Sequence, residues 1–380
     1  MKEPVLSLKL ADPKTGLLAY IVVDEFVGGI AGGGMRMSPS VTEEEVRRLA
    51  EVMTYKWAAM GIPFGGAKMG IVGDPQTPKK QELLRTFGKL AKPLLQTMVF
   101  TGPDMGISSD ELGAVFEEVG IDTVNLVVRH LKTETKVKAL ENVRLSDLGG
   151  RGFEDLITGW GVAQATEEAW NLMGNGIDGA TISIQGFGAV GKSAGVFLHG
   201  IGAKVVCISD AKGTIFEKDG LDVPTIVGNQ VEGGLVNRSK LPKSVERFDR
   251  EYWLSPRTDI LIPAAIPDAI NKSNIRKVKA SLIVEGANIP ASYEIEERLH
   301  KKGVFVVPDF IANAGLVCGF GLIVTGASVG DQREIFQETG NRIRKAVKSV
   351  YRSCKRKNIT PRLAAMEYSK RMKRKIKKRF

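Results

Sequence analysis

The sequence has few cysteines and no long apolar runs. Its three cysteines, Cys207, Cys318 and Cys354, lie far apart and form no CxxC pair, so neither a disulfide framework nor a zinc site is encoded. No segment approaches the ~18 consecutive apolar residues that a membrane-spanning helix needs. The N-terminal MKEP has the pattern of neither a secretory signal nor a transit peptide. We therefore expect a soluble, cytoplasmic protein with no metal site and no membrane partner.

Acidic residues are outnumbered, and the 54 Lys and Arg against 43 Asp and Glu give a net charge of +11. Residues 370–380, KRMKRKIKKRF, hold eight of the basic residues and no acid, so the rest of the chain carries only +3. This tail is explained if it forms the solvent-exposed end of the last helix, because basic residues interact favourably with the helix dipole at a C-terminus. The alternative is an anionic partner such as RNA or a membrane surface. It is less favoured because only Phe380 offers a ring for stacking, and nucleic acid is not an expected partner.

Apolar residues make up 43% of the 380 residues, which excludes a disordered chain and suffices for the cores of two domains. Residues 5–10 and 16–24 are short, apolar and β-rich, and they predict two strands around a turn. The Gly-rich stretches 26–37 (FVGGIAGGGMRM) and 62–75 (IPFGGAKMGIVGDP) predict irregular backbone. A helix is predicted after the N-cap Ser40.

The second half alternates buried strands with helices, which indicates βαβ units and a parallel sheet. The predicted strands are TISIQ, KVVCISD, TDILIPA, SLIVEGA and VFVVPD. We expect a two-domain α/β protein in which residues 151–331 form a Rossmann dinucleotide-binding domain and residues 1–150 a separate α/β domain.

A dinucleotide-binding turn is predicted at GFGAVG, which follows a predicted strand and opens a helix. Gly186 permits the tight turn, Gly188 lets the backbone approach a pyrophosphate, and Gly191 allows close helix–sheet packing. Asp210 closes the next strand, where a carboxylate binds the ribose hydroxyls and repels a ribose phosphate. NAD is therefore favoured, but Lys212 offsets that repulsion and leaves NADP open. The alternative is an ordinary turn between a strand and a helix.

Two lysines have unusual neighbours. Lys56 and Lys68 lie among apolar residues and glycines, and desolvation and mutual repulsion would lower the pKa of both. A lysine whose pKa lies near neutrality serves as an acid or a base, and Asp104, at a predicted strand end, would stay charged and exchange protons with such lysines. A structural salt bridge explains the same residues equally well.

The run IPFGGAKMGIVGDP resembles the active-site motif of the glutamate/leucine/phenylalanine/valine dehydrogenase family. Other segments resemble the family in the family's order: GGGMRM, MTYK, GPDMG, ITGWGV, GFGAVG, DILIPAA, VEGAN and VPDFIANAG. The resemblance spans nearly the whole chain. It implies an NAD(P)-dependent enzyme that reversibly deaminates an L-amino acid to a 2-oxo acid and ammonium. It also implies a homo-oligomer. The first domain of each chain would bind substrate and mediate oligomerisation, and residues 332–380 would return to pack on that domain.

The resemblance also implies roles for single residues. Lys68 matches the catalytic lysine that helps to activate water, Asp104 matches the aspartate that exchanges a proton with the substrate nitrogen, and Lys56 matches the lysine that pairs with the α-carboxylate. The predicted cofactor positions are Thr158, Gly186, Gly188, Ala189, Val190, Gly191, Asp210, Asn288 and Asn313.

Two positions predict the class of substrate. Glutamate dehydrogenases of this family usually have a lysine where this chain has Gly32, and a serine where it has Phe320. Without these partners a substrate γ-carboxylate would stay unpaired in a buried pocket, which is costly. We therefore expect an apolar amino acid, such as leucine, valine or phenylalanine, in a slot lined by Gly32, Gly33 and Phe320. Glutamate is the alternative substrate. The alternative of another class is a catalytically silent, nucleotide-binding regulatory protein with a basic tail.

Overall fold

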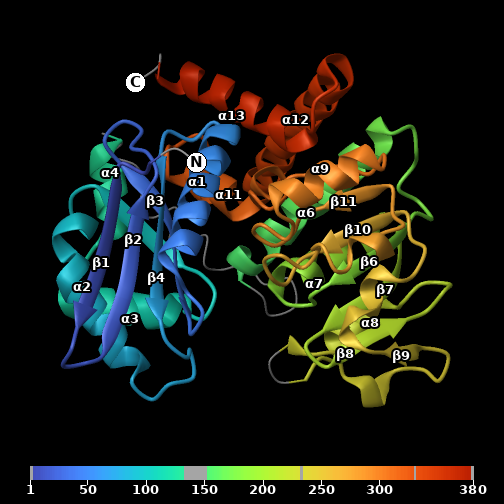
Figure 1. Cartoon of the computed structure of the whole chain (residues 1–380), viewed down its shortest axis with the longest axis horizontal. Helices are drawn as coiled ribbons and strands as arrows, with labels where there is room; N and C mark the ends of the chain where they lie inside the picture. The colour runs from blue at the N-terminus through green and yellow to red at the C-terminus, as the bar shows by residue number, and fades with distance from the viewer. Residues whose placement is uncertain (1–2, 132–151, 232–233, 329–330, 378–380) are drawn as a thin grey trace. The chain divides into compact units, whose positions relative to one another are not determined.

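The computed structural model describes residues 3–131, 152–231, 234–328 and 331–377 (Figure 1). The chain divides into two compact units. Of the described residues, the first unit contains 3–131, 324–327 and 369–377, and the second unit contains the others. Each unit is built on one β-sheet.

The first unit has a five-stranded mixed sheet in the order β1-β2-β4-β3-β5. Its strands are β1 Leu6–Asp12, β2 Leu17–Val23, β3 Ala31–Ser38, β4 Gly65–Val72 and β5 Val99–Pro103. The hairpin β1–β2 is the pair of strands that the sequence predicts, and β3 runs parallel to both β4 and β5. Its helices are α1 Glu43–Ala59, α2 Lys80–Leu95, α3 Ser109–Val119 and α4 Thr123–His130.

Two sequence predictions in this unit are wrong. The Gly-rich stretches contain β3 and β4, which are inner strands of the sheet. The N-cap of α1 is Thr42 rather than Ser40, and the Thr42 hydroxyl accepts a hydrogen bond from Glu45 N at 3.2 Å. Glycine normally weakens a strand and marks a close approach of backbone. That reason holds here, because a Cβ at Gly66 would overlap the Ala50 carbonyl oxygen of α1.

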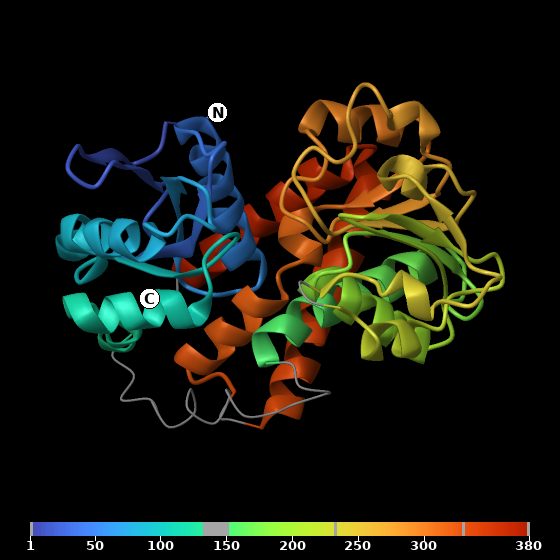
Figure 2. The same cartoon turned by 90° about the horizontal axis from the view of Figure 1, so that it is seen from below.

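Helices cover both faces of this sheet. On one face α1 places Val46 against Val22. On the other face α2 and α3 lie side by side (cyan and teal in Figure 2) and form the larger core with Met35 and Met69. Successive residues of a strand point to opposite faces, so the even-numbered residues of β3 and β4, Arg36 among them, belong to the face that α1 covers.

The second unit has a seven-stranded sheet in the order β12-β11-β10-β6-β7-β8-β9, most of which is labelled in Figure 1. Its strands are β6 Thr181–Gln185, β7 Lys204–Asp210, β8 Gly213–Phe216, β9 Glu246–Phe248, β10 Ile260–Pro263, β11 Leu282–Val284 and β12 Phe305–Val307. The five predicted strands are present and parallel, which confirms the Rossmann prediction. The antiparallel strands β8 and β9 extend the sheet beyond β7 and are not predicted from the sequence.

The remaining helices follow from residue 153 onward. They are α6 Phe153–Leu172, α7 Ala189–Gly200, α8 Val223–Gly228, α9 Tyr293–Lys301, α10 Asp309–Ala312, α11 Gly315–Val324, α12 Gln332–Lys357 and α13 Pro361–Lys377. The helix α7 opens directly after the strand β6 and the glycine turn, as the sequence predicts.

The C-terminal helices group differently from the domain division that the sequence predicts. Residues 331–368 group with the second unit, and only 369–377 of the C-terminal residues group with the first. The reason is the packing of α12 on α6: Trp160 donates a hydrogen bond to the carbonyl of Phe336 at 2.8 Å, and Arg344 pairs with Glu167. The basic tail continues α13 to residue 377, and residues 378–380 lie outside the described part.

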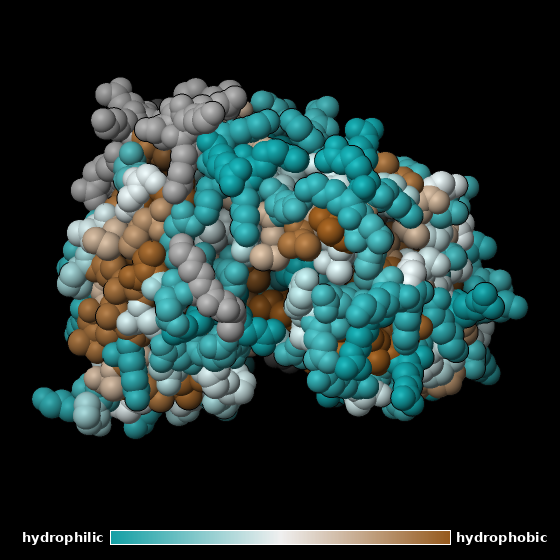
Figure 3. All heavy atoms as spheres, turned by 45° about the horizontal axis from the view of Figure 1, so that its top comes forward, coloured by the Kyte–Doolittle hydropathy of each residue, from teal (hydrophilic) through white to brown (hydrophobic). Residues whose placement is uncertain are grey.

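Most of the face drawn in Figure 3 is hydrophilic, and smaller apolar patches interrupt it. Single exposed apolar residues such as Val5 and Leu8 contribute to the surface of the first unit. Over the described residues, no helix combines the length and apolarity needed to cross a membrane.

Candidate functional site

The residues expected to carry the chemistry meet on the α1 face of the first unit. Lys68 is an even-numbered residue of β4 and is 3% exposed. Its Nζ forms an ion pair with Oδ2 of Asp104, which directly follows β5 and has a side chain 18% exposed. The other oxygen, Oδ1, accepts a hydrogen bond from Met105 N at 2.8 Å. The sheet therefore brings together two predicted residues that are 36 positions apart in the sequence.

A second cation shares the same carboxylate. Arg36 of β3 is 3% exposed, and its Nε and Nη2 donate to Asp104 Oδ2 at 3.3 and 3.2 Å. Its Nη1 contacts Oε1 of Glu45, in the first turn of α1, at 2.5 Å. Lys68, Asp104, Arg36 and Glu45 thus form an ionic chain in which cations and anions alternate. Its two cations are buried and its two acids are partly exposed.

This ionic chain shifts two pKa values in the same direction for different reasons. Burial lowers the pKa of Lys68, Arg36 lowers it further, and the Asp104 carboxylate opposes this only in part. Burial alone would raise the pKa of Asp104, but Lys68 and Arg36 together lower it well below its usual range. The aspartate stays ionised, whereas the neutral form of the lysine becomes easier to reach. Such a lysine can exchange a proton with a bound molecule.

The apolar slot predicted at Gly32 has a different origin in the structure. A Cβ at Gly32 would lie inside the ring of Phe100 on β5, so the space beside this glycine is already filled. The Phe100 ring packs edge-on against Phe64 and Trp57, with centroid distances of 4.9 and 5.7 Å. Trp57 also donates its indole N–H to the Gly32 carbonyl at 2.9 Å. The apolar character comes from this aromatic cluster and not from an open space at Gly32.

The other predicted substrate residues lie in both units. Lys56 is a buried residue of α1, and Gly33 is a buried residue of β3 whose Cβ would overlap the carbonyl oxygen of Ala67. Phe320 is a partly buried residue of α11 in the second unit.

The predicted nucleotide turn has the features that a pyrophosphate requires. Gly186 has a φ of 87° and donates its N–H to the Ser209 carbonyl at 2.8 Å. A Cβ at Gly191 would overlap the Gly186 carbonyl, so helix and strand pack as closely as predicted. Gly188 is the N-cap of α7 and provides no side-chain hydrogen bond, and Ala189 and Val190 begin the helix. The N–H groups of this first turn therefore have no side-chain cap and suit an anion.

Asp210 is already engaged by an arginine that the sequence analysis did not single out. Arg238 donates from Nη2 to Oδ1 at 2.7 Å and from Nη1 to Oδ2 at 3.0 Å. The backbone N–H groups of Lys212 and Val236 donate to the same two oxygens, at 2.8 and 2.9 Å. Despite partial burial, these contacts lower the pKa of Asp210. The carboxylate is therefore ionised, and the charge of Arg238 balances its own. Each of its oxygens accepts two hydrogen bonds.

The predicted cofactor positions Asn288 and Asn313 lie together. The Asn313 side chain donates to Asn288 Oδ1 at 3.2 Å and to the carbonyls of Gly286 and Ala287 at 3.2 and 3.0 Å. Its own Oδ1 is buried and has no hydrogen-bond partner among the residues that the structure describes. Thr158, on α6, lies against α11: a Cβ added to Gly315 of α11 would be only 2.8 Å from the Cα of Thr158. The unmatched amide oxygen is an acceptor for a donor group of a bound molecule.

Comparison with known proteins agrees with the resemblance found in the sequence. Residues 149–378 match the Glutamate/Leucine/Phenylalanine/Valine dehydrogenase family, and residues 6–120 match the Glu/Leu/Phe/Val dehydrogenase dimerisation domain. The chain belongs to this family. Its curated relatives include an NADP-specific glutamate dehydrogenase of Saccharolobus shibatae, 38% identical over 76% of this chain and 66% of that protein. A glutamate dehydrogenase of Thermotoga maritima is 36% identical over 78% of this chain and 69% of that protein. The matched region thus spans about two thirds of these relatives.

Solved structures of the family have the same architecture. A hetero-hexameric glutamate dehydrogenase from Thermus thermophilus, in a leucine-bound form, superposes with a TM-score of 0.77 at 26% identity, over 98% of this chain and 89% of that one. An L-tryptophan dehydrogenase from Nostoc punctiforme gives a TM-score of 0.67 at 23% identity, over 98% and 97% of the two chains, and shows the shared fold. Together the relatives and structures indicate an NAD(P)-dependent amino acid dehydrogenase with a two-domain α/β fold.

Sequence reasoning missed four residues of these sites: Arg36, Glu45, Phe100 and Arg238. Arg36 lies in GGGMRM, one of the family-like segments, so an arginine between glycines and apolar residues was an available signal. Phe100 and Arg238 carry no such signal. Phe100 meets Gly32 only because β5 pairs with β3, and Arg238 meets Asp210 only because a loop folds back onto β7.

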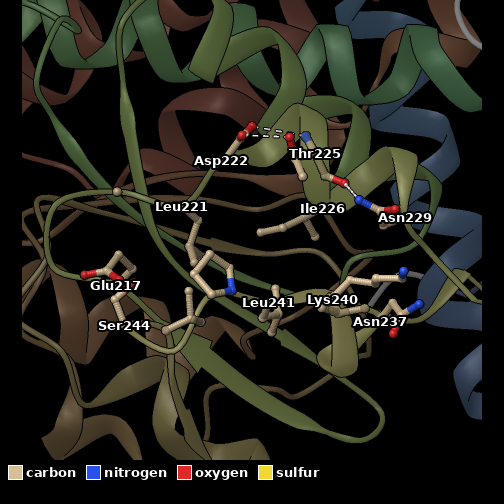
Figure 4. A pocket seen from close by; sticks show the side chains of 14 residues that line it. Glu217, Leu221, Asp222, Thr225, Ile226, Asn229, Asn237, Lys240, Leu241 and Ser244 are labelled. Carbon is tan, nitrogen blue, oxygen red and sulfur yellow. Dashed lines mark hydrogen bonds between the residues drawn. The ribbon is translucent and has the colours of Figure 1, made fainter.

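A separate pocket of about 230 Å³ lies in the second unit, beside α8 (Figure 4). Leu221 and Ile226 line its apolar part, and Asn229, Asn237 and Lys240 line its polar part. It includes none of the predicted site residues. No group of His, Cys, Asp or Glu placed to hold a metal ion is found within the described part of the chain.

Proposed function

We propose that the protein catalyses reversible oxidative deamination of an apolar L-amino acid to its 2-oxo acid and ammonium. The observation that carries this proposal is the buried Lys68–Asp104 ion pair, with a lysine whose pKa is lowered. It occurs in a chain that also has the glycine turn of a dinucleotide site.

The residues of the first unit would perform the proton chemistry. In the deamination direction, neutral Lys68 accepts a proton from the water that attacks the Cα of the imino acid, and its ammonium form then returns a proton as the amine leaves. Asp104 keeps one oxygen on the two cations, so Oδ1 accepts a hydrogen bond from the substrate nitrogen. Lys56 pairs with the α-carboxylate.

The residues of the second unit fit a nicotinamide dinucleotide. The first turn of α7 would hold the pyrophosphate, and the buried Oδ1 of Asn313 would accept a hydrogen bond from a carboxamide N–H. When bound there, a dinucleotide would supply the acceptor for a hydride from the substrate Cα. Thr158 and Asn288 would border the same site.

The proposed preference for an apolar substrate depends on Phe100. A side-chain carboxylate beside Gly32 would meet the rings of Phe100, Trp57 and Phe64 in place of a cation, and an unpaired buried carboxylate is strongly disfavoured. Phe320 stands where glutamate dehydrogenases of this family usually have a serine, so it offers a substrate γ-carboxylate no polar partner. The second candidate is a glutamate dehydrogenase, which the names of the curated relatives favour.

The choice of dinucleotide follows from the Asp210–Arg238 pair. The NAD preference predicted from the sequence assumed a free carboxylate, which repels a ribose phosphate. Because Arg238 neutralises Asp210 and Lys212 lies next to it, that repulsion is removed. We therefore propose that both NAD and NADP are accepted.

We also propose a homo-oligomer formed through the first unit, whose residues 6–120 match the dimerisation domain of the family. Its edge strand β1 exposes Leu8 and lies at the end of the sheet order. An unpaired strand edge with apolar residues is a surface suited to a second copy.

The deciding experiment is a steady-state assay of dinucleotide reduction with glutamate, leucine, valine, phenylalanine and tryptophan, each with NAD and with NADP. Turnover of an apolar amino acid, absent in Lys68→Ala, is the expected result. Turnover of glutamate alone would reject the apolar substrate and retain the chemistry. Binding of dinucleotide without turnover of any of them would instead support the silent regulatory protein.

A matched set of variants tests the role of Phe100. The triple variant Gly32→Lys, Phe100→Ala, Phe320→Ser provides both a cation and the space for it, so its ratio of glutamate to leucine turnover should rise. The double variant Gly32→Lys, Phe320→Ser leaves the ring in place and should not gain glutamate turnover. Equal gains in both variants would contradict the role of Phe100.

A further inference from the structure

The second unit contains a buried ionic cluster that the proposed chemistry does not use. Three carboxylates, Glu285, Glu296 and Asp309, are at most 2% exposed and surround one guanidinium, that of Arg362. Glu285 directly follows β11, Glu296 belongs to α9 and Asp309 to α10, whereas Arg362 belongs to α13. Such a cluster costs desolvation energy, which hydrogen bonds must offset.

Arg362 is the group that contacts all three acids. Its Nε donates to both oxygens of Glu296 at 2.7 Å, and its Nη2 donates to Glu285 Oε2 at 2.9 Å and to Asp309 Oδ1 at 3.1 Å. Its guanidinium carbon also lies 5.4 Å from the centre of the Phe310 ring. The planar guanidinium offers more N–H donors than a lysine ammonium and holds them in a fixed fork.

The cluster holds the loop that carries Asn288. Asp309 accepts a hydrogen bond from Ile289 N at 2.9 Å, and its own N–H donates to Glu285 Oε2 at 2.9 Å. Ile289 has a φ of 51°, a conformation that a β-branched residue adopts only when its surroundings impose it. On the other side of the loop, Asn313 donates to the carbonyls of Gly286 and Ala287.

The charges of the cluster make the arginine indispensable to this arrangement. Burial and the neighbouring carboxylates raise the pKa of Glu285 well above its ordinary value, and burial raises that of Glu296, while Arg362 lowers both. Without the guanidinium, the acids would take up protons or draw in water, and the hydrogen bond that holds Ile289 in its strained conformation would lose its fixed acceptor.

We propose that Arg362 is a positioning residue for the dinucleotide site: through Asp309 and Glu285 it holds residues 286–289 in the conformation that presents Asn288. The proposal rests on the proposed function, because it assumes that Asn288 and Asn313 border the dinucleotide. It assigns to α13, a helix without a predicted site residue, control over cofactor affinity in the second unit.

The test compares Arg362→Lys and Arg362→Met with the wild-type protein. Arg362→Lys keeps the charge and loses the fork, so it is the variant that decides if Arg362→Met does not fold. The matched control is Arg298→Met, which removes an exposed arginine of α9 that pairs with Glu294. For each protein the dissociation constants of NAD and NADP are measured by calorimetry, and the KM of the amino acid is measured at saturating dinucleotide.

We expect both Arg362 variants to bind dinucleotide about tenfold more weakly or worse, with the KM of the amino acid within about twofold of wild type. Arg298→Met should match the wild type in both. A folded Arg362→Lys variant with unchanged dinucleotide affinity overturns the proposal, as does an equal loss of dinucleotide and amino acid affinity, which indicates general structural damage. Failure of the wild-type protein to bind dinucleotide contradicts the proposed function itself.

Discussion

Replacing Arg36 by methionine tests whether the ionic chain, and not burial alone, sets the pKa of Lys68. Both cations contact Oδ2 of Asp104 and therefore lie close to each other. Unit charges ~4 Å apart interact by about 4 kcal/mol at an effective dielectric constant of ~20, and one pKa unit corresponds to about 1.4 kcal/mol. The partial exposure of Asp104 to solvent reduces this interaction. Loss of the guanidinium removes one of the two effects that lower the pKa of Lys68, so that pKa should rise.

The assay is the pH dependence of kcat/KM for deamination, whose rising limb reports deprotonation of the base in the free enzyme. A lowered pKa of Lys68 places this limb below the range of an ordinary lysine. In Arg36→Met the limb should move to higher pH, because the repulsion between Arg36 and the protonated lysine is lost. Arg36→Lys retains the positive charge, so its rising limb should stay close to that of the wild-type enzyme. The control Arg47→Met removes a more exposed arginine that pairs with Glu3 and should leave the limb in place.

The outcome is decisive if stability is measured in parallel. Removing one partner of a buried ion pair costs about 3–5 kcal/mol, so the free energy of unfolding of Arg36→Met should fall by roughly the lower figure, since Glu45 is partly exposed. A folded Arg36→Met enzyme with an unmoved rising limb would contradict this prediction, because the pKa of Lys68 would then be set without Arg36.

Four further outcomes are expected. Lys68→Ala should abolish turnover and leave dinucleotide binding, measured by calorimetry, unchanged; loss of both together would count against its role. Gly32→Ala should lower the free energy of unfolding in urea by about 1–3 kcal/mol, because the new methyl group overlaps the Phe100 ring. In contrast, the exposed helical Gly113→Ala, whose Cβ meets no atom within 4 Å, should be neutral or stabilising. Arg238→Met should raise the KM of NADP much more than that of NAD, since it uncovers a carboxylate; equal effects on both would contradict the neutralised pair.

Local patterns predicted the second unit well. Each parallel strand is a short apolar run next to a helix, and the glycine turn has fixed spacing, so both are visible without tertiary information. The antiparallel strands β8 and β9 escaped prediction because they are short and are defined by pairing with β7 and with each other.

Glycine was the main source of error in the first unit. The stretches around Gly32 and Gly66 have the composition of loops, yet they form inner strands because their glycines let α1 and the Phe100 ring approach the backbone. Such a use of glycine depends on residues distant in the sequence. The same limit applies to the substrate slot, where the ring that fills it comes from another strand.

Motifs and periodicity are local properties of a chain. The family, the parallel sheet and the residue types of the site, Lys68 and Asp104 among them, could therefore be predicted from the sequence. How these residues interact with one another depends on contacts that form only when the chain folds. Folding places Arg36 beside Asp104, Arg238 on Asp210 and α12 on α6, and each contact joins segments whose separation the chain does not encode locally. The charge of a group can be read from its letter, but its pKa and its availability depend on the neighbours that folding brings to it.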